Sequence, residues 1–196
     1  MGFHGCDRAV GEAVIAGTHT LQASNNEYDW LGSGIYFWEN NPARALQFAE
    51  DQVGRKRKHG PPITEPFVVG AIISLGYCLN LLEMRNLQLV KLGYDSVVSS
   101  FKTSGDPLPE NKTVKGGSDL ILRYLDCAVI NGVITINDKD ADRKFDSVRG
   151  VFLEGEELYP NAGFREKNHI QLCIRNPNCI KGYFKPLTAD PNYAIS

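Results

Sequence analysis

The chain has 196 residues, of which 42% are hydrophobic, which is enough for one well-buried core. Its 21 Lys and Arg against 23 Asp and Glu give a formal charge of −2, so any surface that binds nucleic acid must be local. The five cysteines lack zinc-site spacing, and neither a secretory leader nor an apolar run of about 18 residues is present. We therefore expect one soluble, cytoplasmic domain over residues 1–196, with reduced thiols and no membrane partner.

The first third of the chain predicts two strand-to-helix units. A strand leads into His4, and a short helix over residues 8–17 ends at a glycine. A polar loop then precedes the aromatic strand 35–38. The next segment, "NNPARALQFAEDQVGRKRK", predicts a helix with an Asn N-cap and Pro42 at its first position. This helix ends in the basic loop 54–60, "GRKRKHG".

The remaining two thirds mix helices and strands without regular alternation. We expect strands in "PFVVGAIISLG", "SVRGVFLEG", "HIQLCIRN" and "CIKGYFKP", helices over 83–101 and from Ser118 to 133, and an exposed loop over 102–117. Asp126 on the apolar side of the second helix needs a basic partner, Arg123 or Arg149. Because GxGxxG and P-loop motifs are absent, the fold class is α+β rather than doubly wound α/β.

Three short motifs carry residues that are suited to chemistry. His4 in "GFHGCD" combines a directional imidazole with a glycine that lets a ligand approach the backbone. Tyr36 follows two glycines in "GSGIYF". Gln171 alternates with apolar neighbours in "HIQLCIRN", so it faces away from Ile170 and Leu172. Taken singly, each residue is better explained by packing or by solvent exposure.

Taken in order, the motifs resemble the ADP-ribosyltransferase superfamily, in its diphtheria-toxin and poly(ADP-ribose) polymerase branch, which is named for its His, Tyr and Glu. "GSGIYF" followed by "ARALQFA" is the most specific part of the resemblance, which covers residues 2–50 and 163–185. The resemblance implies split antiparallel β-sheets around an NAD cleft with flanking helices. It also implies NAD as the co-substrate, with no metal.

The resemblance assigns roles to particular residues of the cleft. His4 would hydrogen-bond the 2′-hydroxyl of the adenosine ribose, and the backbone of Gly5 would hold the nicotinamide amide. Tyr36 would stack on the nicotinamide ring, and Phe48 would close its other face, since stacking needs a flat π-surface and not a hydroxyl. A serine that many relatives use for the carboxamide aligns with Ala45, which lacks the hydroxyl.

Gln171 stands where the family usually has its catalytic glutamate. A carboxylate stabilises the positive charge that builds on the ribose as the nicotinamide bond breaks, whereas an amide keeps the hydrogen bond without the charge. Either another carboxylate activates the acceptor, or the protein binds NAD without turnover. Glu154, Glu156, Glu157 and Glu166 lie where the superfamily places its acceptor-facing loop, although a solvated acidic loop is the simpler explanation.

The acceptor side is less well marked by the sequence. The basic loop 54–60, with Arg165, Glu166 and His169, is the expected substrate-binding surface, and RNA, DNA and protein acceptors all remain open. The leading hypothesis is a mono-ADP-ribosyltransferase that serves as a bacterial toxin or defence effector, with an antitoxin protein as a partner. The alternatives are an NAD glycohydrolase and a non-catalytic module that binds NAD or ADP-ribose.

Overall fold

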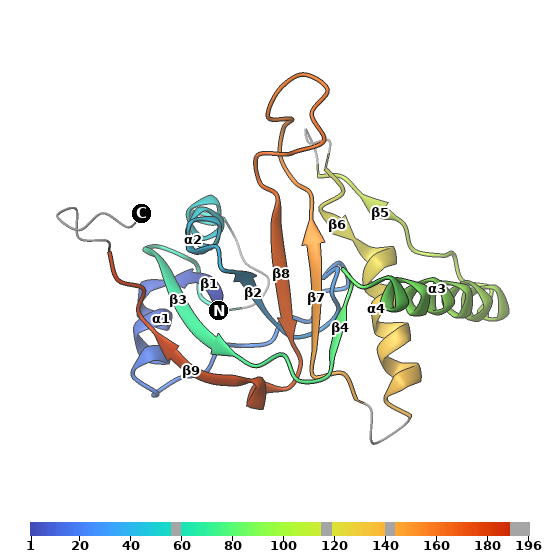
Figure 1. The fold of residues 1–196 in the computed structure, drawn as a ribbon, viewed down its shortest axis with the longest axis horizontal. Helices are drawn as coiled ribbons and strands as arrows, with labels where there is room; N and C mark the ends of the chain where they lie inside the picture. Colours follow the sequence, from blue (N-terminus) through green and yellow to red (C-terminus); the bar gives the residue numbers. More distant parts are fainter. Residues whose placement is uncertain (56–59, 115–118, 140–143, 189–196) are drawn as a thin grey trace.

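The computed structural model describes residues 1–55, 60–114, 119–139 and 144–188 (Figure 1). It has α+β character, as the sequence predicts. The helices are α1 (Arg8–Ile15), α2 (Pro42–Asp51), α3 (Met84–Ser104) and α4 (Tyr124–Asn137). The strands are β1 (Gly2–Asp7), β2 (Ile35–Glu39), β3 (Pro66–Ile73), β4 (Cys78–Asn80), β5 (Asn111–Lys112), β6 (Leu122–Arg123), β7 (Ser147–Phe152), β8 (His169–Ile174) and β9 (Ile180–Phe184).

The strands form one large mixed sheet and one small ladder. Within the described residues, the large sheet has seven strands in the order β4-β7-β8-β2-β1-β3-β9, and β5 pairs with β6. The neighbours in the large sheet are antiparallel except for β4 and β7, which run parallel. In Figure 1, α1 lies beside β3 and β9, α3 and α4 lie beyond β4 at the opposite end, and the β7–β8 connection extends past the sheet.

The pairing between β1 and β2 is short. All six residues of β1 pair with β3, from Gly2↔Ala71 to Asp7↔Pro66. Between the described strands β1 and β2, in contrast, the ladder consists of Gly2↔Glu39 and Phe3↔Trp38. The sheet therefore consists of two halves, β9-β3-β1 and β2-β8-β7-β4, which join along this short ladder.

Three hydrophobic cores cover the two faces of the sheet. The α1 core includes Val14, Ile35, Phe37, Val69, Leu172 and Ile174. The α4 core includes Leu31, Ile130, Val133, Val148 and Cys173, with Trp30 and Tyr36 packed against it. The α2 core consists of Phe3, Trp38 and Ala45, with Phe48, Val68 and Phe184 against it. Because side chains alternate along a strand, Phe37 lies on one face of β2 while Tyr36 and Trp38 lie on the other.

Local sequence signals locate α2 correctly but misplace the start of α4. Asn41 caps α2 by accepting the Arg44 N–H at 3.0 Å, and Pro42 follows it. The expected cap of the later helix, Ser118, lies outside the described residues, and α4 begins at Tyr124. Asn111, from the segment expected to be a loop, accepts the N–H groups of Leu125 and Asp126 at 2.9 and 3.2 Å. Asn111, although distant in the sequence, accepts hydrogen bonds from the N–H groups of the first turn, which a local N-cap residue would otherwise accept.

Asp7 fixes the end of β1 to two other parts of the chain. Its carboxylate accepts the Ala9 N–H at the start of α1 and the Thr64 and Glu65 N–H groups before β3, at 3.0, 2.8 and 3.1 Å. These bonds, chiefly those from the Thr64 and Glu65 backbone, lower the pKa of Asp7 from 3.8 to about 2.

We expect acid to weaken the fold through Asp7. Because the pKa is lower in the folded state, the stabilisation is fully present above pH 3.8 and is lost as the pH falls towards 2. Asp7→Asn should lower the free energy of unfolding at pH 7 and flatten its decrease between pH 4 and 2, as measured by urea denaturation. Asp95→Asn, an exposed carboxylate on α3, is the control. Equal pH profiles for Asp7→Asn and the unmodified chain would contradict this interpretation.

Within the described residues, no helix combines the length and the apolar character that crossing a membrane requires.

Candidate functional site

His4 and Tyr36 meet where the β1–β2 ladder ends. The His4 Nδ1 atom lies 2.8 Å from the backbone carbonyl oxygen of Tyr36, and because a carbonyl only accepts, Nδ1 carries the proton and donates. The imidazole edge packs against the ring of Phe37, with ring centroids 5.8 Å apart. The His4 ring therefore lies towards the α1 core, whereas the Tyr36 ring lies towards the α4 core.

Gly5 lies two residues beyond Phe3, the last residue of β1 that pairs with β2. The Asn40 N–H donates to the Met1 carbonyl at 3.0 Å, and continuation of this register would place Gly5 opposite Tyr36. The Tyr36 carbonyl instead accepts the bond from the His4 ring. A Cβ on Gly5 would lie 2.1 Å from the Ala45 carbonyl oxygen, so the glycine allows α2 to approach β1 closely.

The hydroxyl group of Tyr36 both donates and accepts a hydrogen bond. The hydroxyl donates to the Gly32 carbonyl at 2.8 Å and accepts the Leu31 N–H at 3.1 Å. Burial of this group raises the pKa of Tyr36 well above its usual value, so the side chain stays neutral. The residue as a whole remains partly exposed. The two hydrogen bonds therefore fix the orientation of the Tyr36 ring.

Phe48 and Ala45 lie on the side of α2 that covers the sheet. The Phe48 ring packs against Trp38 with centroids 4.9 Å apart and ring planes at 42°. Ala45 is fully buried against Gly5. Tyr36 and Trp38 share a face of β2, so Phe48 lies on the Tyr36 side of the sheet.

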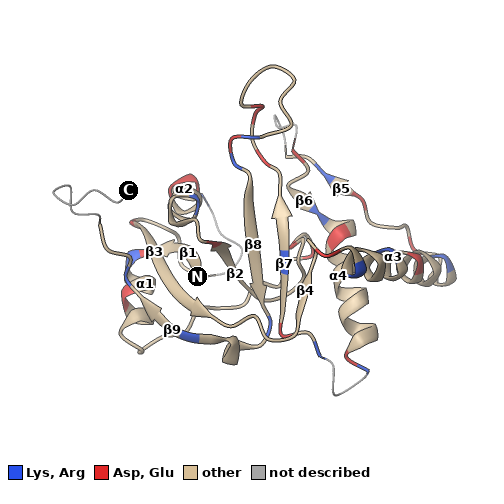
Figure 2. Cartoon of the chain, viewed as in Figure 1, with Lys and Arg blue, Asp and Glu red and all other residues tan. Residues whose placement is uncertain are grey.

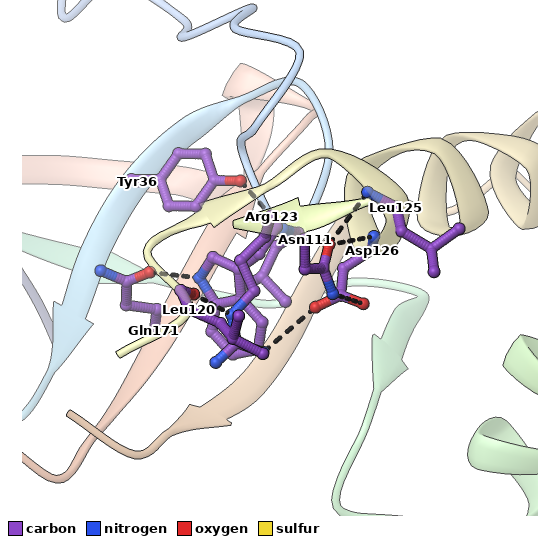
Figure 3. A network of polar contacts seen from close by, with 9 residues as sticks. Tyr36, Asn111, Leu120, Arg123, Leu125, Asp126 and Gln171 are labelled. Atoms are coloured by element: carbon purple, nitrogen blue, oxygen red, sulfur yellow. Dashed lines mark hydrogen bonds and ion pairs between the residues drawn. The ribbon is translucent and has the colours of Figure 1, made fainter. Parts of the chain in front are cut away.

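Gln171 contacts a tryptophan that sequence analysis did not single out. The Trp30 indole N–H donates to Gln171 Oε1 at 2.7 Å (Figure 3). Gln171 lies opposite Trp38 on one side and Gly150 on the other, and a Cβ on Gly150 would come within 2.8 Å of the indole. The Gln171 side chain thus lies on the same face as Tyr36, with its carbonyl oxygen turned towards Trp30.

A basic side chain covers the Trp30 and Phe152 rings. The Arg123 guanidinium carbon lies 5.7 Å from the Trp30 ring centre and 4.6 Å from that of Phe152. Arg123 also forms the expected ion pair with Asp126, at 3.1 Å, and Asn111 completes the network in Figure 3 by donating to the same carboxylate. This network connects Gln171, through Trp30, to the start of α4.

The expected acceptor-side residues separate in the structure. Arg165 and Glu166 lie on the β7–β8 connection, where Arg165 donates to the Gly155 carbonyl at 3.3 Å and Glu166 is exposed. His169 is buried at the start of β8, with 6% of its surface exposed, and burial lowers its pKa. His169 therefore adds no positive charge to a surface groove, and that part of the expectation was wrong, because the Trp38 and Phe152 rings pack against the imidazole.

Charges of both signs are interspersed over the described elements (Figure 2). Most of the basic loop expected at 54–60 lies outside the described residues, since 56–59 are not described. Among the residues that are described, no group of three or more His, Cys, Asp or Glu side chains could hold a metal ion.

A cavity of about 380 Å³ lies on the α1 side of the sheet. Its lining includes Leu21, Ile35, Ile180 and Tyr183. Leu21 and Ile35 belong to the α1 core, which is the side towards which the His4 ring points. This cavity is half open to solvent rather than enclosed.

Trp30 and Arg44 each stand at a position in the sequence where their residue type is unusual. Trp30 is a large aromatic residue within the polar loop that precedes "GSGIYF". Arg44 occupies the first turn of α2, where a cation is unfavourable next to the positive end of the helix dipole. Unusual residues of this kind are often retained for a contact made elsewhere, and here their partners are Gln171 and Glu154.

Comparison with known proteins gives one distant relative. No family model matches the chain, and no solved structure matches it. The chain is 24% identical over 196 residues to the uncharacterized protein MJ0359 of Methanocaldococcus jannaschii, an alignment that covers 91% of this chain and 83% of that protein.

Proposed function

We propose that the protein is a mono-ADP-ribosyltransferase that moves ADP-ribose from NAD to a macromolecule. One observation carries the proposal: the β1–β2 ladder ends where His4 donates to the Tyr36 carbonyl. Two motifs that are about 30 residues apart in the sequence, and that resemble the NAD-binding strands of one superfamily, thereby lie in contact. Gln171 on β8 and Phe48 on α2 share the face of Tyr36.

NAD would cross the sheet where β1 and β2 separate. The nicotinamide would lie on the side of Tyr36 and Phe48, where two aromatic residues support stacking. The adenosine ribose would lie on the side of His4, next to the cavity lined by Leu21 and Ile35. In this proposal, the two halves of the sheet are the split sheets that surround the NAD cleft.

Gln171 also supports a second function, the binding of NAD or ADP-ribose without turnover. Its amide oxygen is occupied by the Trp30 N–H, and an amide cannot act as a base near neutral pH. In the transferase proposal, Gln171 orients the ribose while a group of the acceptor or another carboxylate takes the proton. In the binding proposal, the site retains its contacts and lacks the charge that the reaction needs.

The biological setting that accompanies the transferase proposal is that of a bacterial toxin or defence effector, with an antitoxin protein as its partner. RNA, DNA and protein are the acceptor classes to be distinguished. Inhibition of growth when the chain is expressed alone is the expected result, and normal growth would contradict this setting.

Labelled NAD incubated with whole lysate distinguishes these activities. We expect nicotinamide release and label on a macromolecule, with sensitivity to nuclease or protease identifying the acceptor. His4→Ala should lower the transfer about 10²-fold, because it removes a hydrogen bond that positions the ribose. Arg85→Gln, an exposed residue on α3, is the matched control.

Each other outcome has a defined meaning. Free ADP-ribose without labelled macromolecule would indicate a glycohydrolase. NAD binding by calorimetry with no turnover would indicate the binding module. Full transferase activity in a correctly folded His4→Ala variant would exclude the proposed site.

A further inference from the structure

Buried polar atoms without partners gather around Trp38. Among the described residues, the buried side-chain atoms that lack a hydrogen-bond partner include Trp38 Nε1, Arg44 Nε and Nη1, and His169 Nε2. All three side chains are more than nine-tenths buried, with 4%, 8% and 6% of their surfaces exposed. Each unsatisfied buried group lowers stability, so several together in a native fold call for an explanation.

The three residues come from separate elements and lie close to one another. The Arg44 guanidinium carbon of α2 lies 5.8 Å from the ring centre of Trp38 on β2. The His169 ring of β8 lies 6.1 Å from the same tryptophan. Phe48 and Phe152 pack at the edges of this group, at 4.9 Å from Trp38 and 5.4 Å from His169. The side chains that carry the unpartnered atoms are therefore neighbours within one largely apolar site.

The site already holds one anion, which the chain supplies. Glu154, which follows β7, forms an ion pair with Arg44 Nη2 at 2.8 Å, and its side chain is 17% exposed. This bond uses one nitrogen of a guanidinium that can donate five hydrogen bonds. The first turn of α2, which carries Arg44, adds the positive end of the helix dipole. Unused hydrogen-bond donors of Arg44 and Trp38 therefore remain after Glu154 has bound.

His169 contributes an acceptor rather than another donor. Its Nδ1 atom lies 2.6 Å from the Lys167 carbonyl, so Nδ1 carries the proton of the neutral ring. Burial lowers the pKa of His169, which favours this neutral form at pH 7. Nε2 then presents a lone pair that can accept a bond from a hydroxyl group.

We propose that Trp38, Arg44 and His169 form a binding site for a phosphate group, in which Glu154 takes the place of the phosphate in the ligand-free chain. A phosphate oxygen replaces the Glu154 carboxylate at Arg44 and accepts from the free guanidinium N–H groups and from the Trp38 indole. A protonated phosphate oxygen donates to His169 Nε2. Glu154 turns outwards through its exposed side, which opens the site.

This site does not depend on NAD turnover. Free phosphate and the phosphate of a nucleotide have the chemistry that the site recognises, and they are separated by comparing inorganic phosphate, AMP and adenosine. Sulfate is the test of the His169 contact, because it carries no proton at neutral pH. We expect phosphate or AMP to bind and adenosine not to bind, with sulfate weaker than phosphate.

The decisive variant is Glu154→Gln, which removes the competing charge while its amide oxygen can still accept from Arg44. Calorimetry at pH 7 should show inorganic phosphate or AMP binding about tenfold more tightly to Glu154→Gln than to the unmodified chain. Adding Trp38→Phe, which retains an aromatic ring and removes the N–H, should weaken that binding by about the same factor. Glu12→Gln removes a carboxylate that is paired with Arg8 on the surface, and is the matched control.

Two outcomes would overturn the proposal. One is the absence of phosphate and AMP binding by Glu154→Gln beyond that of Glu12→Gln. The other is binding that Trp38→Phe leaves unchanged. If Glu154→Gln does not fold in buffer, recovery of its circular dichroism spectrum in phosphate but not in sulfate supports the proposal, and failure to recover in phosphate contradicts it.

Discussion

Gln171→Glu raises the rate of nicotinamide release from NAD by about 10²-fold if the proposed transferase site is correct, because it supplies the charge that stabilises the cationic ribose. The structure accommodates the change, since Gln171 Oε1 accepts the Trp30 N–H at 2.7 Å and a carboxylate oxygen can accept the same bond. The substitution replaces the amide group of one side chain by a carboxylate of nearly the same size, so the position of the side chain opposite Gly150 is preserved.

The measurement is nicotinamide release at saturating NAD, with transfer to the lysate acceptor scored in parallel. Gln88→Glu, an exposed position on α3, adds the same charge at a distance and should leave the rate unchanged. An unaltered rate in Gln171→Glu, combined with NAD binding that depends on His4, would favour the non-catalytic binding module.

Gly5→Ala should lower the free energy of unfolding by about 3 kcal/mol, at the upper end of what overpacking usually costs. The added Cβ would lie 2.1 Å from the Ala45 carbonyl oxygen and 3.1 Å from its carbon. Both atoms belong to the backbone of α2, so relief requires the helix to move away from β1 rather than a side chain to rotate.

Urea denaturation at pH 7 measures this loss, and Gly182→Ala on β9 is the control. A Cβ at Gly182 meets nothing within 4 Å, so this variant should change stability by no more than about 0.5 kcal/mol. Equal effects of the two substitutions would show that α2 does not pack closely on β1 at Gly5.

Local signals in the sequence were sufficient for several elements. Asn41 and Pro42 mark the start of α2, and the β-branched run of β3 predicts a buried strand, which the structure confirms. The alternation around Gln171 also placed its side chain correctly, opposite to Leu172. These features depend on residues that are neighbours in the chain.

Contacts between distant residues could not be predicted in this way. The cap that Asn111 provides for α4 joins residues 14 and 15 positions apart, and the Trp30–Gln171 bond joins residues 141 positions apart. His169 was expected in a basic groove because its burial depends on Trp38 and Phe152, which are distant from it in the chain. The resemblance assigned His4 and Tyr36 to one cleft, whereas the pairing of their two strands could not be predicted from the spacing of the residues.

Because the β1–β2 ladder is short, few backbone hydrogen bonds join the two halves of the sheet. Such a junction is the place where a fold separates into units that can exchange their amide hydrogens independently. A ligand that spans the junction contacts both units and would couple them, so that part of its binding free energy would appear as resistance of the whole chain to unfolding. In the protein without ligand, the β9-β3-β1 unit is accordingly held to the rest of the sheet mainly by side-chain packing in the α1 and α2 cores, together with the hydrogen bond from His4.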